Sequence, residues 1–169
     1  MIDKRIYSLY NTNITYKKYM NLLFERKRTM AVIENIEAYI AEEFQWFHRH
    51  PELSYEEVET TKRIRGSLER AGIRILDLPL KTGLVAEIGA GETIVALRSD
   101  IDALPIEEQT DLPYRSEHRG RMHACGHDAH TAALLGAAKI LMRIRSELRG
   151  TVRLLFQPAE EAGDRSGAK

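Results

Sequence analysis

The 169-residue sequence has a single cysteine, no net charge and no long apolar run. One cysteine cannot form a disulfide within the chain, which favours a reducing compartment. The 25 lysines and arginines balance the 25 aspartates and glutamates, so no net charge draws the chain toward nucleic acid or an anionic membrane. The sequence lacks the roughly 18 consecutive apolar residues that span a membrane. We expect no secretory signal, because its basic start has no continuous apolar segment. We therefore expect a cytoplasmic protein with neither nucleic acid nor a membrane as a partner.

Several functional motifs are also missing from the sequence. It contains no phosphate-binding glycine loop, no Rossmann glycine fingerprint and no zinc-deaminase pattern. It contains no internal repeats either. The sequence therefore gives no indication of nucleotide binding, base deamination or a repeat architecture.

Residues 1–29 differ from the rest of the chain because they are rich in tyrosine and show no clear hydrophobic period. We expect an atypical extension there, either disordered or upstream of a true start at Met30. An additional helix is the alternative. Residues 30–169 have the ordered patterns of a folded domain.

The ordered part predicts an α/β fold. Periodic apolar residues predict a helix from Val32 to about His50. Ser54 and Glu57 have the spacing of a capping box, which predicts a second helix that ends at Arg70. Strands, a long loop, a helix and a last strand follow, and we expect a hairpin between the second and third strands. These strands are expected at 73–78, 83–89 and 93–102, the loop at 104–122, the helix at 131–148 and the last strand at 151–157. Functional residues of such a layered sheet lie where strands end.

Two aspartates lie at the end of the third predicted strand. Asp100 and Asp102 are two positions apart, so strand alternation places them on one face. Carboxylates in this position can bind a metal or orient a histidine that does. A solvated strand end is the alternative that these two residues alone leave open.

Residues 122–130 read MHACGHDAH and place Cys125 and His127 two positions apart. Gly126 between them allows a tight turn, and Asp128 lies where we expect a helix cap. A closed zinc site is excluded because it needs four cysteine or histidine ligands and no second cysteine exists. A metal site with thiolate and imidazole ligands, a cysteine nucleophile or redox thiol, and a buried structural cysteine remain open.

The last polar pair, Glu160 and Glu161, follows a predicted strand and a proline in QPAEE. One carboxylate can bind a metal while the other acts as a general base. Adjacent glutamates are common on exposed helices, so this pair matters only in combination with the other two clusters. Together the three clusters favour a water molecule activated by a metal and a glutamate.

Four motifs in this order, HRHPELSYEE, LRSDIDALPIEE, MHACGHDAHTAALLGAAKIL and LLFQPAEE, resemble a known family. It is the amidohydrolase branch of the aminoacylase/carboxypeptidase-G metallopeptidases, which includes hippurate hydrolases, auxin-conjugate hydrolases and N-acetyl-diaminopimelate deacetylases. The resemblance covers residues 30–169 and implies the N-terminal portion of a layered helix-sheet-helix catalytic domain.

The resemblance also implies an activity and a set of roles. The expected reaction is hydrolysis of an N-acyl amino acid, with an acetyl, benzoyl or similar group, to a carboxylate and a free amino acid. Two divalent metal ions, Mn, Zn or Co, are the expected cofactors. Cys125, His127 and Glu161 correspond to metal ligands, Glu160 to the general base, and Asp102 to the aspartate that orients a ligand.

Members of this family are about twice as long or more, and their lid domain, which often forms a homodimer, would follow Lys169. We therefore expect a truncated catalytic domain with weak or no turnover by this chain alone. A non-catalytic remnant that binds metal or a partner is one alternative function. A cysteine-based hydrolase or thiol sensor is another.

Overall fold

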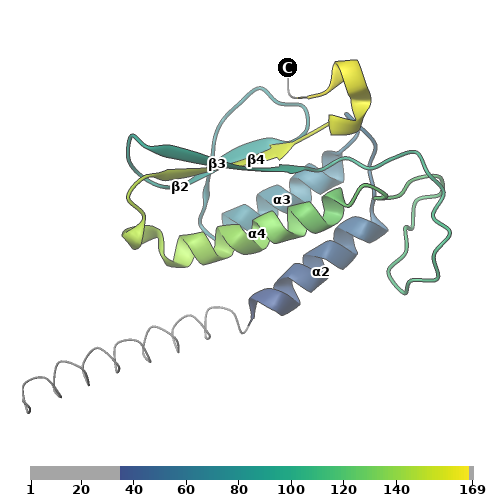
Figure 1. The fold of residues 1–169 in the computed structure, drawn as a ribbon, viewed down its shortest axis with the longest axis horizontal. Coiled ribbons are helices and arrows are strands. Elements are labelled where there is room, and N and C mark those ends of the chain that lie inside the picture. Colours follow the sequence, from purple (N-terminus) through teal and green to yellow (C-terminus); the bar gives the residue numbers. More distant parts are fainter. Residues whose placement is uncertain (1–34, 168–169) are drawn as a thin grey trace, which may run out of the picture. The chain divides into compact units, whose positions relative to one another are not determined.

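The structure is a computed structural model, and it describes residues 35–167 (Figure 1). The extension expected at residues 1–29 lies outside the described residues. The described part contains three long helices and a four-stranded sheet. The helices are α2 (Ile36–Arg49), α3 (Val58–Arg70) and α4 (His127–Arg143), with two short 3-10 helices, η1 (Arg145–Glu147) and η2 (Glu160–Arg165). The strands are β1 (Arg74–Ile75), β2 (Leu84–Gly89), β3 (Ile94–Asp100) and β4 (Thr151–Gln157).

The strand order in the sheet is β1-β2-β4-β3. β4 pairs with β2 antiparallel and with β3 parallel, so it separates the two strands that precede it in the chain. The hairpin that we expected between β2 and β3 is therefore wrong. The backbone of each strand bonds to β4 instead, although the turn at Gly89–Glu92 does connect them.

The core lies between one face of the sheet and the helices α3 and α4, which run beneath it side by side (Figure 1). Alternate residues of β2 and β4 face the helices because successive side chains of a strand point to opposite faces. These are buried apolar residues, and they contact buried residues of α3 and α4. The strand residues are Leu84, Ala86, Ile88, Leu154 and Phe156, and the helix residues include Ile64, Leu68, Leu134, Leu135 and Ala138.

The opposite face of the sheet carries charged side chains. Glu87 on β2 lies between Arg74 on β1 and Arg153 on β4, and it forms ion pairs with both. Hydrogen bonds from Arg153 lower the pKa of Glu87. Charged side chains therefore occupy the central part of this face, whereas the helix-facing side is apolar.

The start of α3 does not use the predicted capping box. Ser54 donates its hydroxyl hydrogen bond to Asp102, and the Glu57 side chain makes no cap bond. Glu52 takes the capping role, because its carboxylate accepts from the backbone amides of Glu59 and Thr60. A carboxylate at this end of a helix also suits the helix dipole.

The α/β fold predicted from the sequence is confirmed. β4 has the predicted bounds, α3 ends at Arg70 as expected, and the loop at 104–122 contains no helix or longer strand. α4 begins at His127, four residues before the predicted start. Within residues 35–167, no helix is both long enough and apolar enough to cross a membrane.

Candidate metal centre

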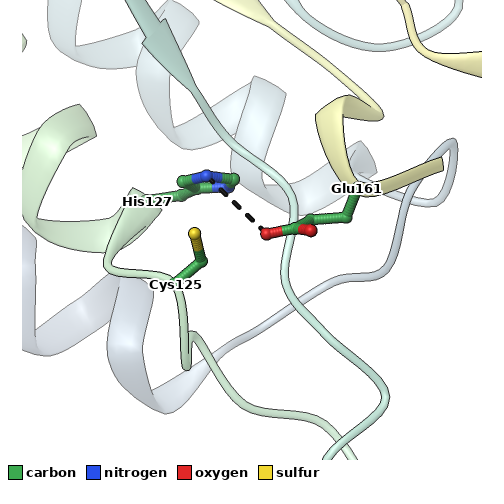
Figure 2. A group of neighbouring side chains, drawn as sticks. All are labelled: Cys125, His127 and Glu161. Carbon is green, nitrogen blue, oxygen red and sulfur yellow. Dashed lines mark ion pairs between the residues drawn. The ribbon is translucent and has the colours of Figure 1, made fainter. Parts of the chain in front are cut away.

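Three segments that are distant in the sequence meet at one end of the sheet (Figure 2). β3 and β4 run parallel, so the residues that follow them leave the sheet at the same end. Asp102 follows β3, and Glu160 and Glu161 follow β4. His127 is the first residue of α4 and Cys125 lies just before the helix cap, so both are at the same place.

The side chains of Cys125, His127 and Glu161 converge on one point (Figure 2). One ligand-type atom from each residue lies within 4.8 Å of the other two. The Nε2 atom of His127 is 3.9 Å from a carboxylate oxygen of Glu161 and 3.9 Å from one of Glu160. A thiol, an imidazole and two carboxylates therefore surround a space of the size that a metal ion fills.

Asp102 fixes the orientation of the His127 ring on the side away from the centre. Its ring is buried, and Nδ1 lies 2.9 Å from the backbone carbonyl of Asp102, to which it donates. The Asp102 carboxylate is 3.4 Å from the same nitrogen. This leaves Nε2 directed toward Cys125 and the glutamates, which is the arrangement that metal-binding histidines generally have.

Asp102 connects the three segments. Its buried carboxylate accepts a hydrogen bond from the Ser54 hydroxyl at 2.7 Å and from the Glu161 backbone amide at 3.0 Å. Burial alone would raise the pKa of Asp102, but its hydrogen bonds with His127, Ser54 and the glutamate amides outweigh burial and lower it. Asp102 is therefore an anion that supports His127 on one side and the glutamate turn on the other.

The electrostatics of the centre favour a cation. The hydrogen bond with Asp102 is the main cause that raises the pKa of His127 to about 9, and the charge of Asp100 adds to it. The hydrogen bond with Glu161 and the nearby carboxylates raise the pKa of Cys125, which is an exposed thiol. Both shifts have one physical origin, because carboxylates gather here and stabilise positive charge. A divalent cation would satisfy the same field and allow the thiol to ionise.

Two residues in left-handed backbone conformations direct the candidate ligands. Gly126, with φ 88°, precedes α4 and separates Cys125 from His127. Ala159, with φ 54°, precedes η2 and the two glutamates. Only glycine adopts this conformation freely, so the alanine is the unusual one.

A second polar cluster lies behind the start of α4. The buried ring of His48 on α2 contacts Asp128 through Nδ1 at 2.6 Å and Glu108 through Nε2 at 3.2 Å. Burial alone would lower the pKa of His48, but the two carboxylates outweigh it and raise the value. Glu108 also accepts from the Ser116 amide, so the cluster joins α2, α4 and the 104–122 loop.

Comparison with known proteins supports the family resemblance. The sequence model described as peptidase family M20/M25/M40 matches residues 96–169. N-acetylcysteine deacetylase of Bacillus subtilis is 61% identical over 117 residues, which are 68% of this chain and 31% of that protein. IAA-amino acid hydrolase ILR1-like 5 of Arabidopsis thaliana is 51% identical over 123 residues, 72% of this chain and 28% of that protein. A crystal structure of a dinuclear metal-binding M20 peptidase from Bacillus subtilis matches with a TM-score of 0.73 at 54% identity, over 76% of this chain and 37% of that one.

The chain is similar to the N-terminal part of M20 peptidases. The family resemblance that the four motifs carry is therefore confirmed, and so is the expected fold class. The chain spans about a third of the length of the curated relatives that it matches.

The structure brings all five predicted site residues together. Cys125, His127 and Glu161 face one another, Glu160 lies beside them, and Asp102 supports them. Asp100 behaves differently, because β3 ends there and its carboxylate accepts hydrogen bonds from Arg98.

The prediction that Asp128 caps α4 is wrong. Asp128 lies inside the helix, Gly126 takes the cap position, and a carboxylate oxygen of Asp128 binds His48. His48, near the end of α2, is buried within this cluster.

Sequence reasoning also missed three residues that pack around the candidate centre. Glu57 and Ser54 were assigned to a helix cap but bond to the backbone of Ala159 and to Asp102. His123 is buried, and burial lowers its pKa to about 4, so it is uncharged beside the charged His127. All three lie within the four motifs that carry the family resemblance, and this was the only indication of a role in the site that the sequence offered.

Proposed function

We propose that this chain carries the metal-binding and proton-transfer residues of a hydrolase that cleaves N-acyl amino acids. The observation that carries the proposal is the convergence of Cys125, His127 and Glu161, with Glu160 beside them. These residue types supply the thiolate, imidazole and carboxylate donors that divalent transition metals bind. The M20 relatives named as deacetylases and amino acid hydrolases support the reaction class.

Cys125, His127 and Glu161 would hold the metal, and two divalent ions are expected because a related M20 structure is described as dinuclear. Bound divalent ions polarise an amide carbonyl and lower the pKa of water. The thiolate favours a softer ion such as zinc or cobalt, whereas the carboxylates suit manganese.

Glu160 is positioned to move protons. Its side chain is more exposed than that of Glu161, and its carboxylate lies within reach of the same space. We infer that Glu160 takes a proton from the attacking water and delivers it to the leaving amine. Asp102 keeps Nδ1 of His127 protonated, so that Nε2 faces the site.

The proposed substrates are small N-acyl amino acids, with acetyl, benzoyl or similar groups. The homodimer expected from the resemblance stays a prediction. Three protein ligands are few for two ions, so we expect slow turnover by the 169-residue chain.

The cysteine-based alternative has less support. Glu161 and burial raise the pKa of Cys125, which disfavours a thiolate without metal. A thiol nucleophile needs the opposite shift.

The test measures release of free amino acid from N-acetyl and N-benzoyl amino acids by the chain loaded with Mn²⁺, Zn²⁺ or Co²⁺. We expect slow hydrolysis that a chelator removes and that Glu160→Gln lowers by roughly 100-fold or more, the size of a general-base contribution. His118→Ala, on the exposed part of the 104–122 loop, is the control and should retain activity. Hydrolysis that resists the chelator but disappears in Cys125→Ala would support the cysteine mechanism instead.

A further inference from the structure

The two glutamates of the centre depend on an unusual turn. Ala159 lies between the end of β4 and the glutamates, with φ 54° and ψ 42°, and its side chain is completely buried. A non-glycine residue in this region needs surrounding structure that enforces the conformation. The direction of the next two side chains follows from the backbone at this residue. Whatever holds Ala159 therefore also directs Glu160 and Glu161.

Glu57 makes the contact that holds this turn. Its carboxylate oxygen accepts a 2.8 Å hydrogen bond from the backbone amide of Ala159, and the two residues are 102 positions apart. The Glu57 side chain has no solvent exposure. It belongs to none of the predicted ligand or base positions, and the capping role that its sequence position suggested is absent.

The backbone around Glu57 is itself braced. The Thr61 hydroxyl donates to the carbonyl of Glu57 and accepts from the amide of Gly83 at 2.8 Å. Gly83 packs so tightly on the segment after β4 that an added Cβ would come within 2.6 Å of Pro158. The start of α3 therefore forms a rigid support beneath the glutamate turn.

On the far side of the turn, Asp102 accepts the Glu161 amide. The glutamate segment is thus held at two amides by two buried carboxylates from different parts of the chain. We propose that Glu57 is a positioning residue, which fixes Ala159 in the left-handed conformation and so brings Glu160 and Glu161 to the metal centre. This inference rests on the proposed function, because it assigns Glu57 a role in building the same site.

The protonation preference of Glu57 agrees with this role. Burial raises its pKa, which favours the neutral acid. A carboxyl oxygen can accept the Ala159 amide in either protonation state. Glutamine has the same shape and the same carbonyl acceptor, so it is the conservative replacement.

The test is a Co²⁺ titration of the full chain, followed by the thiolate-to-cobalt absorption that Cys125 would give. We expect Glu57→Ala to weaken Co²⁺ binding by about tenfold, the lower end of what loss of a supporting group costs. Glu57→Gln should restore the affinity to within about threefold of the wild type, since it keeps the acceptor. Glu57→Asp is the second shortened variant, because its carboxylate is one methylene too short to reach Ala159, and it should weaken binding like Glu57→Ala.

The matched control is Glu43→Ala. Glu43 is also a buried glutamate with hydrogen bonds, to Arg63 and Ser67, but it lies on α2 outside the centre. Its loss should lower the midpoint of thermal unfolding and leave Co²⁺ affinity unchanged. This separates positioning from general loosening of the fold.

The outcomes are distinct. Wild-type Co²⁺ affinity in Glu57→Ala, or in Glu57→Asp if Glu57→Ala does not fold, would overturn the positioning role and leave the proposed function intact. An equal loss in Glu43→Ala would overturn it as well. A wild-type chain that binds Co²⁺ without the thiolate absorption would instead remove the proposed metal site and the inference with it.

Discussion

The two segments that carry the candidate ligands both turn through a left-handed residue, but they accommodate it differently. Gly126, between Cys125 and His127, has an open surrounding, since an added Cβ would meet no atom within 4 Å. Ala159, before the two glutamates, is completely buried and is held through its amide by Glu57. Glycine removes the cost of the turn locally, whereas the alanine turn needs support from residues about 100 positions away in the chain.

This difference separates a locally encoded half of the centre from a half that tertiary contacts impose. The Cys125–His127 turn depends on one glycine, so it should respond to changes at that position alone. The glutamate turn depends on packing, so it should respond to changes in its supports. Asp102 contacts both halves and should therefore affect both.

The largest effect is expected from Asp102→Ala, which removes support from both turns. Loss of its carboxylate should weaken Co²⁺ binding by roughly 10–100-fold. It should also lower the pKa of His127 from about 9, because the hydrogen bond with Asp102 is the main cause of the raised value. Metal titration and NMR of the imidazole nitrogens measure the two effects.

The raised pKa of His127 also links this pair to stability. In the metal-free wild type, charged His127 adds its full contribution to the free energy of unfolding below about pH 6.5, the pKa of histidine in the unfolded chain. It is lost as the pH rises through about 9, the folded value. Urea unfolding across this window should show that slope in the wild type and a smaller one in Asp102→Ala. If the free energy of unfolding had the same dependence on pH in Asp102→Ala, then Asp102 would not be the cause of the raised His127 pKa.

A smaller effect is expected from Gly126→Ala. The space around Gly126 is open, so the new methyl group meets no neighbour and the cost comes from the backbone conformation alone, about 1–2 kcal/mol. Urea unfolding measures this loss. Co²⁺ affinity should fall as well, because Cys125 and His127 then lie in a strained turn.

The control for Gly126→Ala is Gly72→Ala. Gly72 also has a positive φ, at +69°, and its nearest neighbour, the Met142 methyl, leaves room for a Cβ. It follows α3 and lies outside the centre. Similar destabilisation with unchanged Co²⁺ affinity is expected, and equal affinity losses in both variants would show that general strain is responsible.

The smallest effect is expected from Ala159→Gly. Relief of the left-handed strain is offset by the greater freedom of glycine in the unfolded chain, about 0.4–1 kcal/mol, and by loss of a buried methyl group, about 0.8 kcal/mol. The free energy of unfolding should therefore change by less than about 1 kcal/mol. A large destabilisation would mean that the methyl packing, and not the amide bond to Glu57, fixes the turn.

The elements that the sequence predicted correctly are those specified by local patterns. The apolar run of residues 151–157 and the alternation of β2 gave strands, and the Ala- and Leu-rich face gave α4. The pairing of strands was not predictable in this way, because Gly89–Glu92 suits a hairpin whether or not a later strand enters between its arms. The insertion of β4 depends on contacts across more than 50 residues.

The candidate site shows the same division. Ligand-type residues were visible in the sequence because Cys125, His127 and Glu161 lie in polar clusters at a predicted helix start and a predicted strand end, and these clusters point to a metal only in combination. Their supports were not visible, because Ser54 and Glu57 fit a helix cap equally well by spacing. In the folded chain, Asp102 and Ala159 lie within hydrogen-bond distance of Ser54 and Glu57, so these side chains bond to the site and not to the helix end.

The strand order has a consequence for how the chain reaches its folded state. β2 and β3 both take β4 as their partner, and β4 is synthesised about 50 residues after β3. Until residues 151–157 are available, β2 and β3 each have an edge of unpaired backbone groups. Long-range strand pairing of this kind is slow and leaves the chain exposed to aggregation. The glutamate turn follows β4 directly, so the centre is assembled in the last step of sheet formation. The inner strand β4 and the two candidate carboxylates therefore come into place together, after every other strand of the sheet is already present in the chain.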